Sequence, residues 1–300
     1  MIFRIAVFVL AFLFWGVTPV LSWQKVQVDV DLDEDKSIQE LQQQGLREGF
    51  SLAVVQESQR MVPGELSDER KKILGEHLEW KINDLVMGYR IFSREEVDGS
   101  LQMDLQVNVD NATLRNILQR TGVYYTSTVP WKYGLSTRGS SPGDFGMLQR
   151  LQKITGVEVD NDAHTSVSLV RLHDGSWSGS IDYKDISFEV SGGDLNRVWF
   201  DLWAFFFTHP EVMSQMTMDF TLKTTGWVTI DAIMYFDEIL LSWDQKVEKG
   251  SIQYIHTDVP SFRAGWSLTS LNPDLLRQSL EEYLSSRGIY YSIDENNRQD

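Results

Sequence analysis

The sequence predicts an α+β protein of two domains, each a mostly antiparallel sheet with helices packed on one face. Three observations favour this class: runs of alternating apolar and polar residues, an Asp-Gly pair at 98–99 that is typical of a hairpin turn, and a strand–helix–Gly–strand unit that occurs twice. The two copies cover residues 101–126 and 268–293, and a fainter third covers 148–159. Duplication and two uses of a common βαβ arrangement explain the repeat equally well.

Both copies of this unit carry signals that begin and end a helix. Residues 101–109 alternate apolar and polar, which predicts a strand with one buried face. Asp110 is placed to cap the following helix, and Gly122 suits the left-handed residue that ends it. In the second copy Asn272 is the expected cap, with Pro273 at the first helical position. These matching positions are architectural, because none of them is a reactive group.

A Leu-Arg pair also opens both helices, at 114–115 and 276–277. Arg115 and Arg277 lie near helix N-termini, where the helix dipole disfavours a positive charge. We therefore expect each to pair with a nearby acid, and Asp110 and Asp274 are the candidates.

Composition limits the classes of protein that remain. The chain has 300 residues, of which 42% are hydrophobic, so it can bury one large or two ordinary cores. It has no cysteine, which excludes a disulfide framework, a thiolate metal site and a thiol nucleophile. The formal net charge of −16 argues against non-specific binding to nucleic acid or to anionic lipid.

The N-terminal segment predicts export. Arg4 precedes an apolar run at 5–16, and Pro19 and Ser22 follow it, which is the order found in a secretory signal peptide. We expect cleavage after about Ser22, so that residues 1–22 are absent from the mature chain; the alternative is an uncleaved anchor. The mature part has no apolar run long enough for a membrane span. A cysteine-free exported chain fits the bacterial periplasm.

The first domain is expected over residues 23–128, in the order β-α-α-β-β-α-β. Ser37 and Glu40 form a capping box, so a long helix begins there. Gly45 and Gly49 fall inside this helix, where each costs roughly 1 kcal/mol relative to Ala. We interpret them as points where the helix approaches the sheet closely, with a partner-binding groove as the alternative.

The acidic residues of the first strand also raise a calcium hypothesis. Asp29, Asp31, Asp33 and Glu40 stand at the spacing of a calcium-binding loop. Glu34, however, occupies the position that needs glycine, and the apolar residues between the acids require a core. A strand with an acidic outer face is therefore the preferred interpretation.

This arrangement resembles the N-terminal domain of the flagellar assembly protein T family. The shared cues are Trp23 and Val26 just after a signal peptide, the Ala/Gly-spaced helix around 46–53, the later hairpin and its closing strand at 107–110. They cover residues 23 to about 125, and the second half of the chain does not match. The resemblance implies a non-enzymatic periplasmic component of a ring around the flagellar base.

A Pro/Gly/Ser-rich stretch at 129–146 is the predicted linker between the domains. Trp131 and Tyr133 lie inside it and are candidate ligand contacts, although aromatic residues in a loop more often pack onto a neighbouring domain. The second domain is expected over 147–294, and residues 295–300 form a polar tail.

The second domain is expected to combine a meander-like sheet with one aromatic helix. Asp194 is the predicted cap of that helix, at 195–207, which is too short to span a bilayer and which we interpret as buried core; a docking helix is the alternative. Alternation or apolar content predicts strands at 166–172, 177–183, 186–190, 216–222, 228–236, 238–243, 251–257 and 262–268.

The sequence shows no catalytic motif with diagnostic spacing. The five histidines have no metal-ligand spacing, and nucleophile-elbow and phosphate-loop patterns are absent. Asp201 is the candidate catalytic carboxylate, because it lies among Trp and Phe residues in the sequence. Apolar surroundings raise the pKa of a carboxyl group, and a carboxyl group that stays protonated can act as a general acid. Its alternative role is that of a helix-surface residue facing solvent.

These observations predict a non-catalytic, exported envelope protein that acts as an assembly or scaffold component. We expect no cofactor, no metal and no nucleic acid, and we expect other envelope proteins as partners. The alternative is a glycan- or peptidoglycan-binding protein, or a hydrolase, that uses an exposed Trp and a pair of carboxylates.

Overall fold

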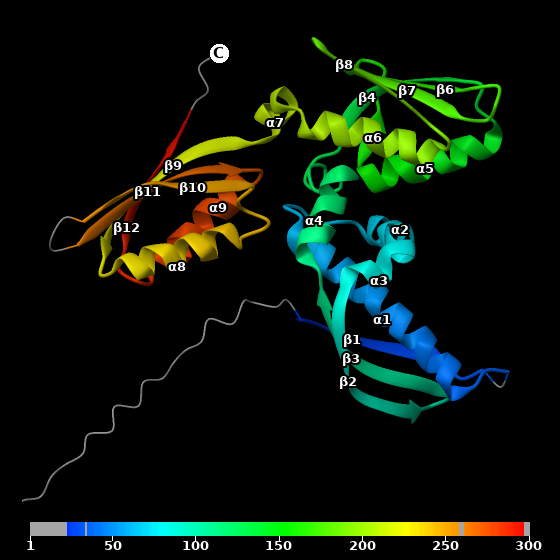
Figure 1. The fold of residues 1–300 in the computed structure, drawn as a ribbon, viewed down its shortest axis with the longest axis horizontal. Helices are drawn as coiled ribbons and strands as arrows, with labels where there is room; N and C mark the ends of the chain where they lie inside the picture. Colours follow the sequence, from blue (N-terminus) through cyan, green and yellow to red (C-terminus); the bar gives the residue numbers. More distant parts are fainter. Residues whose placement is uncertain (1–22, 34, 258–260, 297–300) are drawn as a thin grey trace, which may run out of the picture.

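The computed structural model describes residues 23–33, 35–257 and 261–296, and within them the chain forms three sheets with helices between the strands (Figure 1). The α+β class and the mostly antiparallel pairing are confirmed. We call the parts of the chain that carry the three sheets the first unit (23–128), the second unit (129–217) and the third unit (218–296). The predicted signal peptide, residues 1–22, lies outside the described residues.

The first unit is a three-stranded antiparallel sheet in the order β1-β3-β2. The helix α1 lies along one face of this sheet (Figure 1). Its elements are β1 (Trp23–Asp31), α1 (Ile38–Met61), α2 (Asp68–Leu78), η1 (Glu79–Lys81), α3 (Ile82–Leu85), β2 (Val86–Val97), β3 (Ser100–Val109) and α4 (Asn111–Arg120).

Local signals in the first unit act as the sequence predicts. Ser37 and Glu40 form the capping box of α1, and Asp110 caps α4 by accepting from Thr113 N at 3.0 Å. Gly45 and Gly49 bring α1 close to the sheet: a Cβ at Gly45 would lie 2.9 Å from a sulfur of β3, and one at Gly49 would overlap a leucine of the same strand. Close packing onto the sheet is therefore confirmed.

The prediction of a strand after Gly122 is wrong, because the chain does not join a sheet there. Gly122 is left-handed, with φ of 80°, but residues 121–129 form turns and bends. The amide of Tyr124 donates to Leu118 O, and those of the next two residues donate to Gly122 O. Because these amides are used locally, the segment cannot pair with a sheet, although its aromatic side chains are buried.

The second unit has a five-stranded mixed sheet in the order β5-β4-β6-β7-β8, in which β4 is parallel to both of its neighbours. The helices α5 and α6 lie side by side against one face (Figure 1). Its elements are β4 (Trp131–Arg138), α5 (Pro142–Thr155), β5 (Val157–Val159), β6 (Thr165–Arg171), β7 (Trp177–Tyr183), β8 (Ile186–Gly192), α6 (Leu195–Thr208) and α7 (Pro210–Met216).

The stretch 129–146, expected as a linker, contains β4 and the first turn of α5. Ser141 and Asp144 form a capping box there, and Pro142 is the first helical residue. The polar and Pro-rich composition therefore marks the start of a helix. The strand before it is an interior strand, paired with β5 on one side and β6 on the other, and its Tyr133 is fully buried.

The third unit is a four-stranded antiparallel sheet in the order β10-β11-β9-β12. Its elements are β9 (Met218–Trp227), α8 (Ile230–Leu241), β10 (Lys249–His256), β11 (Phe262–Ser270), α9 (Pro273–Leu280), the π-helical turn η2 (Glu281–Ser285) and β12 (Tyr290–Glu295). Residues 228–236 and 238–243 were predicted to be two strands, but the helix α8 occupies most of them. The prediction of a meander-like sheet is therefore wrong. Thr229 caps this helix, and Ile233 and Phe236 face the core at helical spacing.

Two separate hydrophobic cores hold these units. The first core joins the first and second units and runs from Val26 to Val212, whereas the second lies wholly in the third unit. In α6 the side chains of Trp199, Trp203 and Phe206 are fully buried, which confirms a core helix. The Trp199 indole donates to Thr155 Oγ1 at 2.8 Å, so its polar atom is satisfied as well.

Arg70 of α2 joins the first unit to the second. Its guanidinium donates to Ile154 O at 3.0 Å, to Thr126 O at 3.0 Å and to Thr126 Oγ1 at 2.7 Å. Ile154 is in the last turn of α5, where carbonyl groups lack partners and a positive charge is favoured. Burial lowers the pKa of Arg70 to about 10, which keeps it charged at neutral pH.

Candidate functional site

The structure buries the two aromatic residues proposed as ligand contacts. Tyr133 is fully enclosed, and its hydroxyl accepts from Gln152 Nε2 at 2.7 Å. Trp131 is partly buried, donates from its indole to Thr165 Oγ1 at 3.0 Å and packs against Phe206. Both side chains therefore pack in the core between β4 and α6, which is the alternative to ligand binding that the sequence offered.

Asp201 lies on the outer side of α6, away from the buried rings. Its carboxylate pairs with Arg120 at 3.3 Å and with Arg197 at 3.7 Å, and it is partly exposed. This is the helix-surface position considered as its alternative role. In the part of the chain that the structure describes, no group of three or more acidic or histidine side chains is arranged to hold a metal ion.

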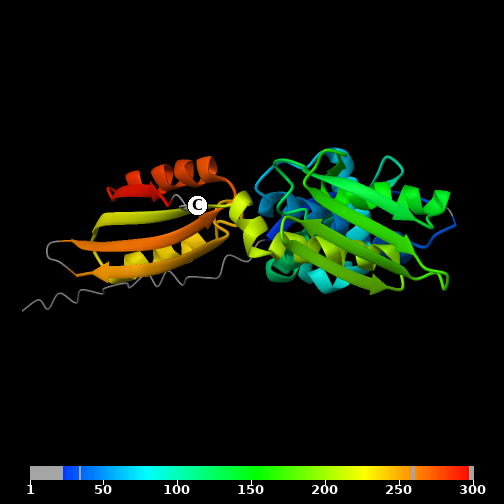
Figure 2. The ribbon, with the colours of Figure 1, turned by 90° about the horizontal axis from the view of Figure 1, so that it is seen from above.

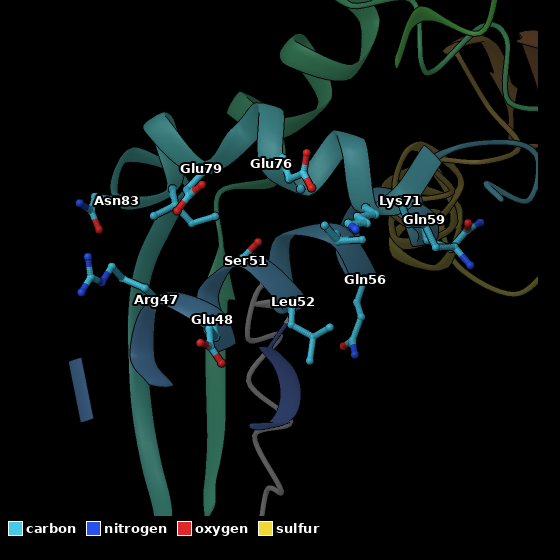
Figure 3. A pocket seen from close by; sticks show the side chains of 14 residues that line it. Arg47, Glu48, Ser51, Leu52, Gln56, Gln59, Lys71, Glu76, Glu79 and Asn83 are labelled. Atoms are coloured by element: carbon cyan, nitrogen blue, oxygen red, sulfur yellow. The ribbon is translucent and has the colours of Figure 1, made fainter. Parts of the chain in front are cut away.

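A groove between α1 and α2 is the first candidate site (Figure 3). Its volume is about 880 Å³. Leu52, Val55 and Ile82 supply apolar surface, and charged side chains of both helices stand around them. In Figure 3, Arg47 and Asn83 mark one end of the groove. An apolar strip with charged flanks is the usual shape of a site for an amphipathic helix.

The groove exists because the two helices approach each other closely at one point. A Cβ at Gly75 of α2 would lie 3.1 Å from Val55 Cγ2 and 3.5 Å from Ser51 Oγ of α1. Ser67 caps α2 by accepting from Arg70 N at 3.3 Å, which fixes where the second helix begins. The sequence drew attention to glycines of α1, but the glycine that sets this contact belongs to α2.

The lining of this groove suits binding. Its residues include no histidine, and Ser51 is the one hydroxyl among them. The charges along it are mixed, since both lysines (Lys71, Lys72) and glutamates (Glu76, Glu79) line it. A nucleophile needs a base within hydrogen-bond reach, and among the described residues no hydrogen bond joins Ser51 to a carboxylate of the groove. The lining presents apolar and charged side chains to a bound molecule.

A second groove, of about 890 Å³, lies where α2, α4, α5 and α6 meet. Trp80 stands at this groove with 73% of its surface exposed, and Asp201 and Glu76 line it. His77 packs on the ring of Phe200 with centroids 4.9 Å apart. Burial, followed by the charge of a nearby arginine, lowers the pKa of His77, as is expected of a packed histidine.

Of the two ion pairs predicted for Arg115 and Arg277, the structure has the second and not the first. Arg277 pairs with Asp274 at 3.4 Å, as predicted. Arg115 pairs instead with Asp244 of the third unit at 2.6 Å, because Asp110 is engaged as the cap of α4. The sequence could not reveal that contact, since 129 residues separate the two partners.

A scan of protein-family models and a search of curated proteins both find no match for this chain. None of the helices in the described ranges has the length and apolar character needed to cross a membrane.

Proposed function

We propose that this chain is an exported, periplasmic assembly or scaffold component of the cell envelope, and that it acts through protein–protein contacts without catalysis. The observation that carries the proposal is the α1/α2 groove, which combines an apolar strip, charged flanks and no nucleophile–base pair. The resemblance of residues 23 to about 125 to the flagellar assembly protein T family points in the same direction. The partner would present an amphipathic helix.

The repeated unit supports an architectural role. Asp110 and Asn272 both cap the helix that follows a sheet strand, and Gly122 and Gly288 are both left-handed after it. The likeness extends further, because β1-β3-β2 and β9-β11-β10 have the same order. In both units helical structure separates the first two strands and a helix follows the third, although the first unit has α1, α2, η1 and α3 where the third unit has α8 alone. We propose that the first and third units are two copies of one scaffold.

A groove substitution with a matched control tests the proposal. Leu52→Glu places a charge in the α1/α2 groove, and Leu172→Glu places the same charge at a leucine of similar exposure elsewhere, 43% against 40%. Tagged protein is used to capture partners from an envelope extract, and the captured proteins are identified by mass spectrometry. A partner should be retained by wild type and Leu172→Glu and lost by Leu52→Glu. Equal retention by all three would refute the groove as the binding site.

Export and the absence of catalysis need separate measurements. N-terminal sequencing of the native protein should begin near residue 23, and a chain that still begins near Met1 would contradict cleavage. Purified mature protein should give no turnover of peptidoglycan or of a glycoside panel. Turnover that is abolished when one carboxylate is changed to its amide would establish a hydrolase instead.

Glycan binding remains a second candidate because of Trp80. A largely exposed indole beside Asp201 and Glu76 is the combination of aromatic surface and carboxylates that the alternative requires. Trp80→Ala should then reduce binding to peptidoglycan fragments. Tyr290→Ala is the matched control, since Tyr290 is 76% exposed on the third unit. Binding that is absent in wild type, or equal in both variants, would exclude this candidate.

A further inference from the structure

The third unit has the construction of a separate arm. Its core consists of residues between Phe220 and Ile289 alone, and Figure 2 shows it as a lobe beside the other two units. The chain enters it once, through Thr217 between α7 and β9. The second unit therefore carries the arm covalently, while the arm's polar contacts described below are made with the first unit.

Four charged side chains form the centre of the contact between the arm and the first unit. We call them the ionic latch; they are Arg60 and Arg115 of the first unit and Asp244 and Glu248 of the third. Arg115 lies 2.6 Å from Asp244 Oδ1 and 3.4 Å from Glu248 Oε2. Arg60 lies 3.3 Å from the other oxygen of Asp244. The side chains of Arg115, Asp244 and Glu248 are 21%, 16% and 7% exposed, so this part of the latch is largely shielded from water.

The first unit holds its two arginines ready for the arm. Arg60 is anchored by the fully buried carboxylate of Glu57, with Nε 3.0 Å from both of its oxygens. Arg115 donates to Tyr124 Oη at 2.9 Å, and the Tyr124 hydroxyl in turn donates to Asp244 O at 2.8 Å. The guanidinium groups are therefore fixed by the first unit itself, and the arm brings the carboxylates to them.

The rest of this contact is also mostly polar. Gln245 Nε2 donates to Gln59 O and Asn272 Nδ2 donates to Pro63 O, each at 3.2 Å. Leu271 is the third-unit side chain that packs, partly buried, against the first core. Because the two hydrophobic cores remain separate clusters, no shared core holds the arm against the first unit, and relative motion is the usual behaviour of such junctions.

We propose that the third unit is a rigid arm whose docking on the first unit is controlled by the ionic latch, and that the arm swings away on Thr217 when the latch is broken. Docked and open forms are then two discrete states of the same folded chain. A shielded carboxylate without its arginine is costly, so a change of one charge shifts the balance between them.

The absence of cysteine makes the arm easy to follow. Asp68→Cys in α2 and Val228→Cys in the third unit introduce two labelling sites at highly exposed positions. Fluorescence energy transfer between the two labels, measured on single molecules of the mature chain, reports the distance between the first unit and the arm. The unaltered latch should give one docked population.

Arg115→Glu sets a carboxylate against Asp244 and Glu248, and it should raise the ratio of open to docked molecules about tenfold or more. The matched control is Arg120→Glu, which reverses the same charge on the same helix at an exposed pair outside the latch. It should leave the populations unchanged. Near-ultraviolet circular dichroism must match wild type in both variants, because Arg115 belongs to neither core.

Asp244→Asn provides a second variant from the other side of the latch, and it should open the arm in the same direction. The proposal is overturned if Arg115→Glu and Asp244→Asn leave the docked population unchanged, or if Arg120→Glu opens the arm equally. It is also overturned if the open form appears only together with loss of the near-ultraviolet signal, since the arm would then move by unfolding.

Discussion

Arg70 is expected to be the most sensitive charged residue of the junction between the first and second units. Arg70→Met keeps an unbranched, apolar stem of similar length and removes the guanidinium. Ile154 O and Thr126 O then lose the donor that reaches them from α2. Both carbonyl groups belong to buried residues, and the methionine side chain supplies no replacement donor.

The magnitude follows from these contacts. A hydrogen bond to a charged group contributes about 1.5–3 kcal/mol, and a buried acceptor left without a partner costs about 1–3 kcal/mol. Two orphaned carbonyl groups therefore predict a loss of about 2–6 kcal/mol in the free energy of unfolding of the first core. Gly156→Ala should act at the same place, because its φ is 73° and a Cβ there would overlap the Arg70 guanidinium.

Equilibrium unfolding in urea, followed by near-ultraviolet circular dichroism, measures this loss. Arg150→Met is the matched control: Arg150 links the same two helices through Glu76 at 2.8 Å, but both side chains are over 40% exposed. An exposed pair contributes about 0–1 kcal/mol, so this variant should unfold almost like wild type. If Arg70→Met and Arg150→Met cost the same, the reasoning about the junction is refuted.

Three further predictions concern packing and protonation. Trp203→Ala should cost about 3–5 kcal/mol in thermal or urea unfolding because the indole is fully buried, and a wild-type melt would contradict this. Gly49→Ala should lower the melting temperature, whereas Gly88→Ala, where a Cβ meets nothing within 4 Å, should not. His77 has a lowered pKa in the fold, so the unfolded chain binds its proton more readily. Stability should therefore fall as pH drops below about 6.5, and His77→Gln should make pH titrations of stability flatter in that range.

The sequence predicts this fold best where a local rule decides the structure. Capping at Ser37, Asp110 and Asn272 depends on a few neighbouring residues, and each of these caps is present. The aromatic helix is equally clear, because a run of large apolar side chains in an acidic chain has to be buried. In such places propensity, pattern and packing agree.

The sequence fails where two local interpretations compete. In 228–243 the apolar residues are so dense that period two and period 3.6 both fit, and Thr229 as a cap was the signal that could have decided for α8. At 129–146 the Pro/Gly/Ser content hides an interior strand followed by a helix start. The number of sheets was missed for the same reason, because β4 joins β5 to β6 in the second sheet.

The candidate sites could be predicted only in part. Trp131, Tyr133 and Asp201 were chosen for their residue type, but burial and ion pairing depend on elements distant in sequence. Both grooves and the ionic latch lie between elements from different parts of the chain. The periodicity of apolar residues along the sequence does not predict which elements contact each other. Trp80 is one of several exposed aromatic residues, and its solvent accessibility marks it where no sequence motif does.

The separation of the two cores has a consequence for how the chain folds as it is synthesised. The residues of the first core end at Val212 and those of the second begin at Phe220, so the two sets do not interleave along the chain. A chain that emerges from its N-terminus can therefore complete the first core while the last 80 or so residues are still to come. The third unit then folds on a finished surface, on which Arg115 is already in place.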